Sequence, residues 1–276
     1  MRWFQEIELG RALPRARGEP ARLGFLEGIA RRDADELLAS FSAQPLIDDP
    51  RHGRIEGEQA FRAYVVAMRG WLAQQRGIEP VALTSTDERT VEEVAVGLTG
   101  EHPELPVAIA TDLAADGRID AIRVYHSLWP LTGGHEIRPP LLDEDPAIEL
   151  GGSPADYQRG LADGDADAVV ASFEPDGMVR EPSGGPYTYR GAAHHAIYDV
   201  MFANEGGIPL QFCTVTDDGS RCAIEYNAVR WGKDQIPPQA GMAVYERGPS
   251  GRLAAARIYD DVTPPEASDS TEGLDR

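Results

Sequence analysis

The sequence predicts an α+β protein built from two consecutive units of one fold, each with helices on one face of a curved antiparallel sheet. Two observations lead to this prediction. Three sequence segments occur twice, in the same order and at nearly the same spacing. Within each copy, segments with helical periodicity come first, and segments with the alternating pattern of strands follow.

The repeat is clearest around two aspartates. The segment RRDADELLASF contains Asp33, and its counterpart DGDADAVVASF contains Asp165, 132 positions later. PLIDDP ends at Pro50 and GMVREP ends at Pro182, again 132 positions later. GRIDAIRVYHSLWP and GRLAAARIYDDVTP form a third pair, 134 positions apart. Repeats of this length are whole domains, because each copy is long enough to hold its own core.

The composition divides the chain into five parts. Residues 1–20 are rich in Arg and Pro and are expected to form an irregular extension. The first domain, called unit one here, spans 21–131, and the second, unit two, spans 153–265. The Gly- and Pro-rich stretch 132–152 is the predicted linker. The acidic, polar tail 266–276 is expected to be disordered.

The elements of unit two are predicted in order. Ser153 is the expected N-cap of a first helix that ends near Gly164, and Asp165 caps a second. A short strand, GMVREP, follows, and a third helix begins after Gly191. Four strands, joined by turns typical of antiparallel hairpins, complete the unit at 210–216, 221–231, 240–247 and 252–262. Unit one shows the same order.

The charge balance excludes two classes of partner. The 276 residues carry a formal net charge of −20, which would repel nucleic acid and anionic membranes. Neither a signal peptide nor a membrane span is evident, so we expect a cytoplasmic protein. Cys213 and Cys222 flank a predicted hairpin turn and are expected to be free thiols in a reducing compartment.

The sequence indicates neither a cofactor nor a metal. Lys233 is the sole lysine and has no Gly-rich loop before it, which excludes a phosphate-binding loop of that kind. The six histidines and two cysteines show no ligand spacing such as HxxxH or CxxC. We therefore expect no bound metal and no cofactor.

Three motifs carry a resemblance to a known family: GDADAVVASFEPDGMVREP, YRGAAHHAIYDVM and SGRLAAARIYDDV. They are similar to the nuclear transport factor 2-like superfamily, which includes SnoaL-like polyketide cyclases, ketosteroid isomerases, scytalone dehydratase and limonene epoxide hydrolase. The resemblance implies two cone-shaped domains in tandem, each able to enclose a small hydrophobic molecule. Members often dimerise through their sheets, which implies an internal pseudo-dimer here, with or without further homo-oligomerisation.

The same resemblance implies a partial catalytic site in unit two. The carboxylate directly before the proline of the first strand, the general base in ketosteroid isomerases, corresponds to Glu181. The tyrosine that donates to the enolate oxygen, eight residues before Asp165, corresponds to Tyr157. The position of the second donor, a protonated carboxylic acid, holds Ala243. A glutamate in an apolar cone has its pKa raised toward working pH, and a buried tyrosine stabilises developing negative charge.

Unit one retains less of this pattern. Asp49 stands before Pro50 and is the counterpart of Glu181. Phe25 occupies the tyrosine position, and Ile109 the position of the acid.

Strand alternation supplies further candidates for the pocket of unit two. Glu225 and Asn227 share one face of their strand, which is either the concave face or a solvated one. Tyr198 on the third helix is a further candidate. Tyr259 and Asp260 point in opposite directions, so only one of them enters the cone, and the sequence leaves open which.

Two functions remain open at this point. The first is an enzyme that performs isomerase, cyclase, dehydratase or epoxide hydrolase chemistry on a small hydrophobic compound, with Glu181 as base and Tyr157 as donor. The alternative is a non-catalytic binding or scaffold protein whose sites have decayed, as the residues at Ala243, Phe25 and Ile109 suggest.

Overall fold

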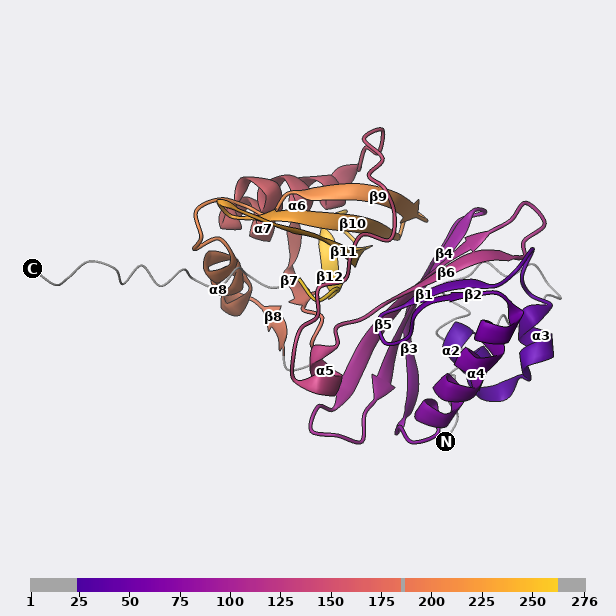
Figure 1. Cartoon of the computed structure of the whole chain (residues 1–276). Coiled ribbons are helices and arrows are strands. Elements are labelled where there is room, and N and C mark those ends of the chain that lie inside the picture. The colour runs from indigo at the N-terminus through magenta and orange to yellow at the C-terminus, as the bar shows by residue number, and fades with distance from the viewer. Residues whose placement is uncertain (1–23, 185–186, 263–276) are drawn as a thin grey trace, which may run out of the picture.

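The computed structural model describes residues 24–184 and 187–262. The predicted extension 1–20 and acidic tail 266–276 lie outside the described residues. Helices and strands of the described residues form two groups with the same order of elements along the chain (Figure 1).

In the described residues, unit one consists of the helices α2, α3 and α4 on a six-stranded sheet. The spatial strand order is β2-β1-β6-β5-β4-β3. Its elements are α2 (Phe25–Arg31), α3 (Ala34–Leu38), β1 (Leu46–Asp49), β2 (Gly53–Glu56), α4 (Glu58–Leu72), β3 (Gly77–Ser85), β4 (Arg89–Gly97), β5 (Glu104–Leu113) and β6 (Ile119–Tyr125). A short helix, α5 (Trp129–Thr132), leads into the linker.

Unit two repeats this architecture. The spatial order β8-β7-β12-β11-β10-β9 matches that of unit one strand for strand. Its elements are α6 (Gly152–Asp163), α7 (Ala166–Ala171), β7 (Phe173–Arg180), β8 (Thr188–Arg190), α8 (Ala192–Met201), β9 (Leu210–Asp217), β10 (Arg221–Trp231), β11 (Asp234–Arg247) and β12 (Leu253–Tyr259). The fold class is therefore α+β in two tandem units, as the repeat predicts.

The sheets are mixed, whereas the sequence predicted antiparallel ones. In each unit the first strand pairs in parallel with the last: β1 with β6, and β7 with β12. The remaining pairs are antiparallel. Hairpin turns signal antiparallel neighbours, but a pairing between strands far apart in sequence leaves no local signal.

The predicted N-caps of the second helix are confirmed in both units. The Asp33 side chain accepts a hydrogen bond from the Glu36 amide, and the Asp165 side chain accepts one from the Ala168 amide, both at 2.9 Å. Each cap satisfies an amide that the first helical turn leaves without a partner.

The start of α6 differs from the prediction. The helix begins at Gly152, with Gly151 at the N-cap position and no side-chain cap. The Ser153 side chain is instead buried and forms no hydrogen bond in the described part of the chain. The predicted end is correct, because Gly164 caps α6 in the left-handed conformation that glycine accepts readily.

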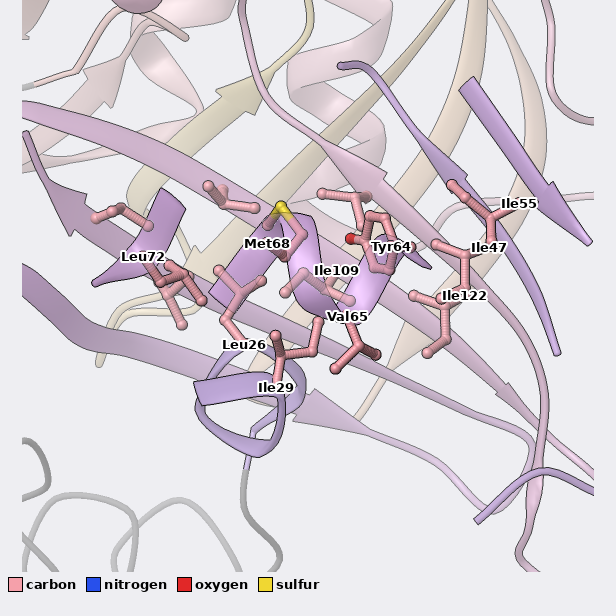
Figure 2. Close-up of a cluster of buried hydrophobic side chains, with 14 of the residues drawn as sticks. Leu26, Ile29, Ile47, Ile55, Tyr64, Val65, Met68, Leu72, Ile109 and Ile122 are labelled. Atoms are coloured by element: carbon pink, nitrogen blue, oxygen red, sulfur yellow. The ribbon is translucent and has the colours of Figure 1, made fainter. Parts of the chain in front are cut away.

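Each unit has its own hydrophobic core between its helices and one face of its sheet. In unit one, Tyr64, Val65 and Met68 of α4 pack against Ile109 and Ile122 of the sheet (Figure 2). The core of unit two is richer in aromatic side chains, with Tyr157, Phe173, Tyr198, Tyr226, Trp231 and Tyr245 among its members.

The opposite faces of the two sheets pack against each other, and the helices lie on the outer sides (Figure 1). A third buried cluster joins Val91, Ala108, Ala110 and Tyr125 of unit one to Ala223, Met242, Val244 and Tyr259 of unit two. Each sheet is therefore covered on both faces. Among the described residues, no helix is long and apolar enough to cross a membrane.

Candidate functional site

Unit two encloses a cavity of about 430 Å³ between its helices and the inner face of its sheet. Most of the wall is aliphatic or aromatic. Helices α6 and α8 contribute Tyr157, Leu161, Ile197, Tyr198, Val200 and Met201, and the sheet contributes Val179, Leu210, Tyr226, Ala228, Trp231, Tyr245 and Ile258. A few polar groups converge in this apolar space, as is usual for small-molecule sites.

Strand alternation decides which side chains reach the cavity. Tyr226 and Ala228 of β10 line it, and Glu225 and Asn227 between and before them point to the other face. At the end of β12, Asp260 lines the cavity and Tyr259 does not. The structure thus settles which member of each pair is inside.

Glu181 follows β7 and lies on the cavity wall. Its backbone amide donates to the Tyr187 carbonyl, and its own carbonyl accepts from the Gly184 amide, which holds the residue at the strand end. Burial raises the pKa of its carboxyl group, and nearby His135 partly offsets this. In residues 24–184 and 187–262, no side chain forms a hydrogen bond to the Glu181 carboxylate. It is therefore free to accept a proton.

Asp260 is the second carboxyl group of the cavity. It is 8% exposed, its Oδ2 accepts a short hydrogen bond from the Tyr226 hydroxyl, and its Oδ1 accepts from the Val262 amide at 3.2 Å. Burial raises its pKa to about 7, and the charges of Asp261 and Glu181 act in the same direction. Asp260 is therefore divided between its neutral and charged forms near pH 7.

Tyr157 and Tyr198 form a hydroxyl chain on the helical side of the cavity. The Tyr198 hydroxyl donates to the Tyr157 oxygen at 3.0 Å. The Tyr157 proton consequently points to no acceptor among the described residues and is available to a ligand. Burial raises the pKa of Tyr157 to about 12, so the hydroxyl is neutral and can donate.

Residues between the two units close one side of the cavity. Trp129 of α5 and His135 of the linker are part of the wall. Asp261 fixes this segment, because its carboxylate accepts from the Leu128 amide at 2.9 Å and lies 3.0 Å from Nδ1 of His135. The ring of Tyr187 in turn meets Trp129 edge to face, with 5.5 Å between centroids.

Glu225 and Tyr259, predicted as pocket residues, lie in the contact between the units instead. Glu225 accepts from Arg123 at 2.9 Å and from the Tyr125 hydroxyl at 2.8 Å, both of unit one. Burial raises the pKa of Glu225, but the bonds and charge of Arg123 outweigh it and hold the pKa below its ordinary value. Tyr259 donates to Glu93 of unit one at 2.6 Å.

Two further predicted wall residues also lie away from the cavity. The amide of Asn227 donates to the Leu142 carbonyl of the linker at 3.0 Å. Ala243 is fully buried in the core of unit two, opposite Ile258 on β12, but is not among the residues that line the cavity. Asp260 follows Ile258 by two residues, so a carboxyl group reaches the cavity from the strand next to Ala243.

The counterpart carboxylate in unit one is fully engaged. Asp49 is 2% exposed and accepts from the amides of Arg51 and His52, from the ring of His52 at 2.9 Å and from the Tyr64 hydroxyl at 3.2 Å. Burial alone would raise its pKa, but the contact with His52 and the nearby His126 lower it below the ordinary value. Asp49 is thus a buried carboxylate that holds neighbouring backbone and side-chain groups in place.

Several residues of the cavity wall were not predicted from the sequence. Tyr226 was detectable, because it alternates with Glu225 on β10. Asp261 and His135 carried no signal, since their contact joins a linker to a strand end 126 positions away. Within the described residues, no cluster of three His, Cys, Asp or Glu side chains could hold a metal ion, and both cysteines are free.

No protein-family model matches this chain, and no curated protein does. Solved structures are similar in fold over part of it. An NTF2-like protein of unknown function from Cytophaga hutchinsonii matches with 13% identity, 42% of this chain, 94% of its own and a TM-score of 0.32. A SnoaL-like protein of unknown function from Burkholderia thailandensis matches with 14% identity, 39% and 90% coverage and a TM-score of 0.33.

A hypothetical protein with a ketosteroid isomerase-like fold from Catenulispora acidiphila, solved with trimethylamine, gives 13% identity, 41% and 88% coverage and a TM-score of 0.34. These likenesses concern the fold and say nothing about the activity of this chain.

Proposed function

We propose that the cavity of unit two binds a small hydrophobic carbonyl compound and moves a proton at the carbon next to the carbonyl group. The observation that carries this proposal is the pairing of two unlike carboxyl groups in one apolar cavity. Glu181 has no side-chain partner in the described chain, and Asp260 is held by Tyr226. Two carboxyl groups in unlike environments are suited to separate acid and base roles.

In this proposal Glu181 is the general base. Its carboxylate removes the proton, and the electron pair of the C–H bond passes into the enolate. Because burial raises its pKa, Glu181 is a stronger base than an exposed glutamate. A positioned general base contributes roughly 10²–10⁴-fold to a rate.

The negative charge that develops on the substrate oxygen needs hydrogen-bond donors. The Tyr157 hydroxyl is one, and the bond that it accepts from Tyr198 stabilises charge on its own oxygen as it donates. Neutral Asp260 is the second. It supplies the carboxylic acid whose expected position holds Ala243. Isomerase or cyclase chemistry through an enolate is therefore the favoured member of the four chemistries.

Deuterium exchange of a simple ketone tests this function, because it reports removal of the proton beside a carbonyl group whatever the natural substrate is. The probe is 2-tetralone in buffered heavy water, and NMR follows the loss of the proton signal beside its carbonyl group. We expect the full-length protein to accelerate exchange, and Glu181→Gln to reduce the enzymatic rate at least about 100-fold. Asp176→Asn, an exposed carboxylate of the same strand β7, is the matched control and should leave the rate unchanged.

Binding of 2-tetralone is measured separately by saturation-transfer NMR. Exchange at the buffer rate by a protein that binds the ketone would refute the catalytic proposal and favour the alternative, a non-catalytic binding module. Failure of both binding and exchange would remove ketones of this type as ligands.

We also infer that the two units form an internal pseudo-dimer. The support is a contact that repeats across the two sheets. Arg123 and Tyr125 of β6 reach Glu225 of β10, and Arg257 and Tyr259 of β12 reach Glu93 of β4. These partners occupy the same strand positions in each unit, as the contact residues of a two-fold dimer do.

A further inference from the structure

His135, in the linker, contributes a titratable side chain to the cavity wall. Its ring is also 39% exposed, so it borders the cavity and the solvent at the same time. Its charge is close enough to Glu181 to lower the pKa of that carboxyl group.

The orientation of His135 is fixed from one side. Its Nδ1 lies 3.0 Å from Oδ1 of Asp261, a carboxylate that also receives the Ser127 hydroxyl and the amides of Leu128 and Glu136. Four contacts from residues 127–136 to one carboxylate fix this segment and hold the ring in place. With Nδ1–H directed to Asp261, Nε2 carries the free lone pair, and no described side chain binds it.

Glu181, the base of the proposed reaction, needs a neighbouring group that can take up its proton and pass it to solvent. Glu181 is partly buried on the cavity wall, so a neighbouring base that also reaches solvent would help to carry away the proton that it takes from a bound ketone. The other groups around Glu181 are ill-suited to carry it. Asp260 already receives the Tyr226 hydroxyl, and Tyr157 and Tyr198 are buried hydroxyls with raised pKa values.

We propose that His135, oriented by Asp261, is the proton shuttle between Glu181 and solvent. This inference rests on the proposed function of Glu181. The proton that Glu181 removes from the substrate carbon passes to Nε2, which leaves Glu181 as carboxylate and gives an imidazolium paired with Asp261. The imidazolium releases the proton to water from its exposed side and becomes neutral again. The reverse sequence delivers a deuteron to the enolate carbon in heavy water.

The decisive experiment compares the full-length protein with His135→Ala in the 2-tetralone exchange assay. We expect His135→Ala to slow exchange at least about 10-fold, because general acid–base groups contribute 10²–10⁴-fold and water replaces part of the function. Added imidazole should restore the rate in proportion to its concentration. Binding of 2-tetralone, followed by saturation transfer, should stay within about twofold. Glu181→Gln should not respond to imidazole.

Two outcomes would overturn the shuttle. One is an unchanged exchange rate in His135→Ala. The other is a loss that imidazole does not restore, since a structural role of the ring would not respond to a free base. An unfolded variant is recognised by its melting temperature, and His135→Gln, which keeps a polar side chain of similar length, then takes its place.

A readout without catalysis separates this inference from the proposed function. Carbon-13 NMR of the Glu181 carboxyl group gives its titration directly. Because His135 lowers the pKa of Glu181, that pKa should rise in His135→Ala and in no comparable way in His102→Ala. If the wild type shows no exchange but the Glu181 titration shifts in His135→Ala, the proposed function fails and the electrostatic coupling of His135 to Glu181 stands. If exchange depends on Glu181 but neither rate nor titration depends on His135, the shuttle alone fails.

Discussion

The two units share one strand order, and they differ in how they treat the same region of the fold. In unit one Val96 and Ile109 fill part of the space between helices and sheet, and a cavity of about 280 Å³ remains between α2, α4 and the strands β3 and β4. In unit two the matching positions hold Ala228, which lines the larger cavity of about 430 Å³, and Ala243, which lies in the core. Side-chain volumes at a few positions therefore change the size and the place of the space that one scaffold leaves open, and the strand order stays the same.

The corresponding carboxylates of the two units, Asp49 and Glu181, also differ in their surroundings. Asp49 of unit one is engaged by backbone amides, a histidine and a tyrosine. Glu181 of unit two keeps its carboxylate free of side-chain bonds in the described chain. Engaged carboxylates stabilise the fold, and a free carboxylate in an apolar cavity is costly and suited to chemistry. At this position unit one thus has a structural carboxylate and unit two a carboxylate suited to a site. A different carboxyl group of unit one, Glu92, borders the smaller cavity, and burial raises its pKa to about 7.

The largest expected loss of stability comes from removing the buried ion pairs between the two units. Arg257→Ala leaves Glu93, which is 0% exposed, without its ion-pair partner, and Arg123→Ala leaves Glu225 only its longer pair with Arg89 at 3.8 Å. Each change should lower the free energy of unfolding by about 3–5 kcal/mol, as urea denaturation would measure. Arg123→Ala should cost somewhat less, because Glu225 retains Thr214 at 2.6 Å and Tyr125.

Two controls define this result. Arg159→Ala removes an exposed pair with Asp156 and should cost at most about 1 kcal/mol. A double replacement by apolar side chains, Arg257→Met with Glu93→Leu, should recover most of the loss. Equal effects of Arg159→Ala and Arg257→Ala would show that the buried pairs do not join the units.

The next prediction tests the role of side-chain volume at Ile109 of unit one and Ala228 of unit two. Ile109→Ala creates a cavity in unit one and should lower the free energy of unfolding by about 2–5 kcal/mol. Ala228→Val gives unit two the residue that unit one has at this position. We expect a stability change below about 1 kcal/mol, because the new methyl groups enter existing space. Binding of 2-tetralone should weaken in Ala228→Val and remain unchanged in Ile109→Ala, and the reverse pattern would place the ligand in unit one.

A third prediction concerns how stability depends on pH, which should differ in sign between Asp260 of unit two and Asp49 of unit one. Because the pKa of Asp260 is raised to about 7, the folded state holds a proton that the unfolded state releases near pH 4. Its contribution therefore weakens the fold as pH rises from about 4 to 7, on the order of 2–4 kcal/mol. Asp260→Asn should reduce this slope in urea denaturation, and the slope that remains should come from Glu92 of unit one, whose pKa burial also raises to about 7.

The contribution of Asp49 to stability changes with pH in the opposite direction. Its pKa is lowered, so its stabilisation is present above the ordinary aspartate value and is lost as pH falls through the lower folded value. Asp49→Asn should flatten the acid side of the curve and leave the slope between pH 4 and 7 intact. Identical pH profiles of the two variants would contradict the contrast between a site carboxylate and a structural one.

The smallest effect tests what the units have in common. Asp33→Ala and Asp165→Ala each remove an N-cap hydrogen bond of 2.9 Å at the same place in the fold. Each should cost about 0.5–2 kcal/mol, and the two costs should agree closely. Thermal denaturation monitored by circular dichroism is sufficient to measure it. A cost in one unit alone would mean that the helices of the two units are held differently.

Much of this fold could be predicted from the sequence. The repeat indicated the two units, and local signals such as Asp33, Asp165 and Gly164 marked helix ends correctly. The parallel pairing of β1 with β6 and of β7 with β12 could not be predicted, because it joins strands that no turn connects. Local patterns report on neighbours in the chain, and this pairing is decided by closure of the sheet.

The candidate site was predictable to a lesser degree. Glu181, Tyr157, Tyr198 and Asp260 do meet on one cavity wall. Alternation separated Glu225 from Tyr226, and Tyr259 from Asp260, but it could not say which face of the strand is concave. His135 and Asp261 meet only because the chain folds a linker back onto the end of the last strand.

The sequence by itself determined that there are two copies of one unit, the helix ends at Asp33, Gly164 and Asp165, and the alternation of faces along each strand, because periodicity and caps are local properties of the chain. Only the tertiary structure decided which face of each sheet encloses a cavity and which meets the other unit. The physical reason is that both faces of these strands are buried, so burial alone does not distinguish an apolar core from an interface of paired charges. That choice follows from where Arg123 and Arg257 find their carboxylates, and it assigns Glu225 to the interface and Asp260 to the cavity.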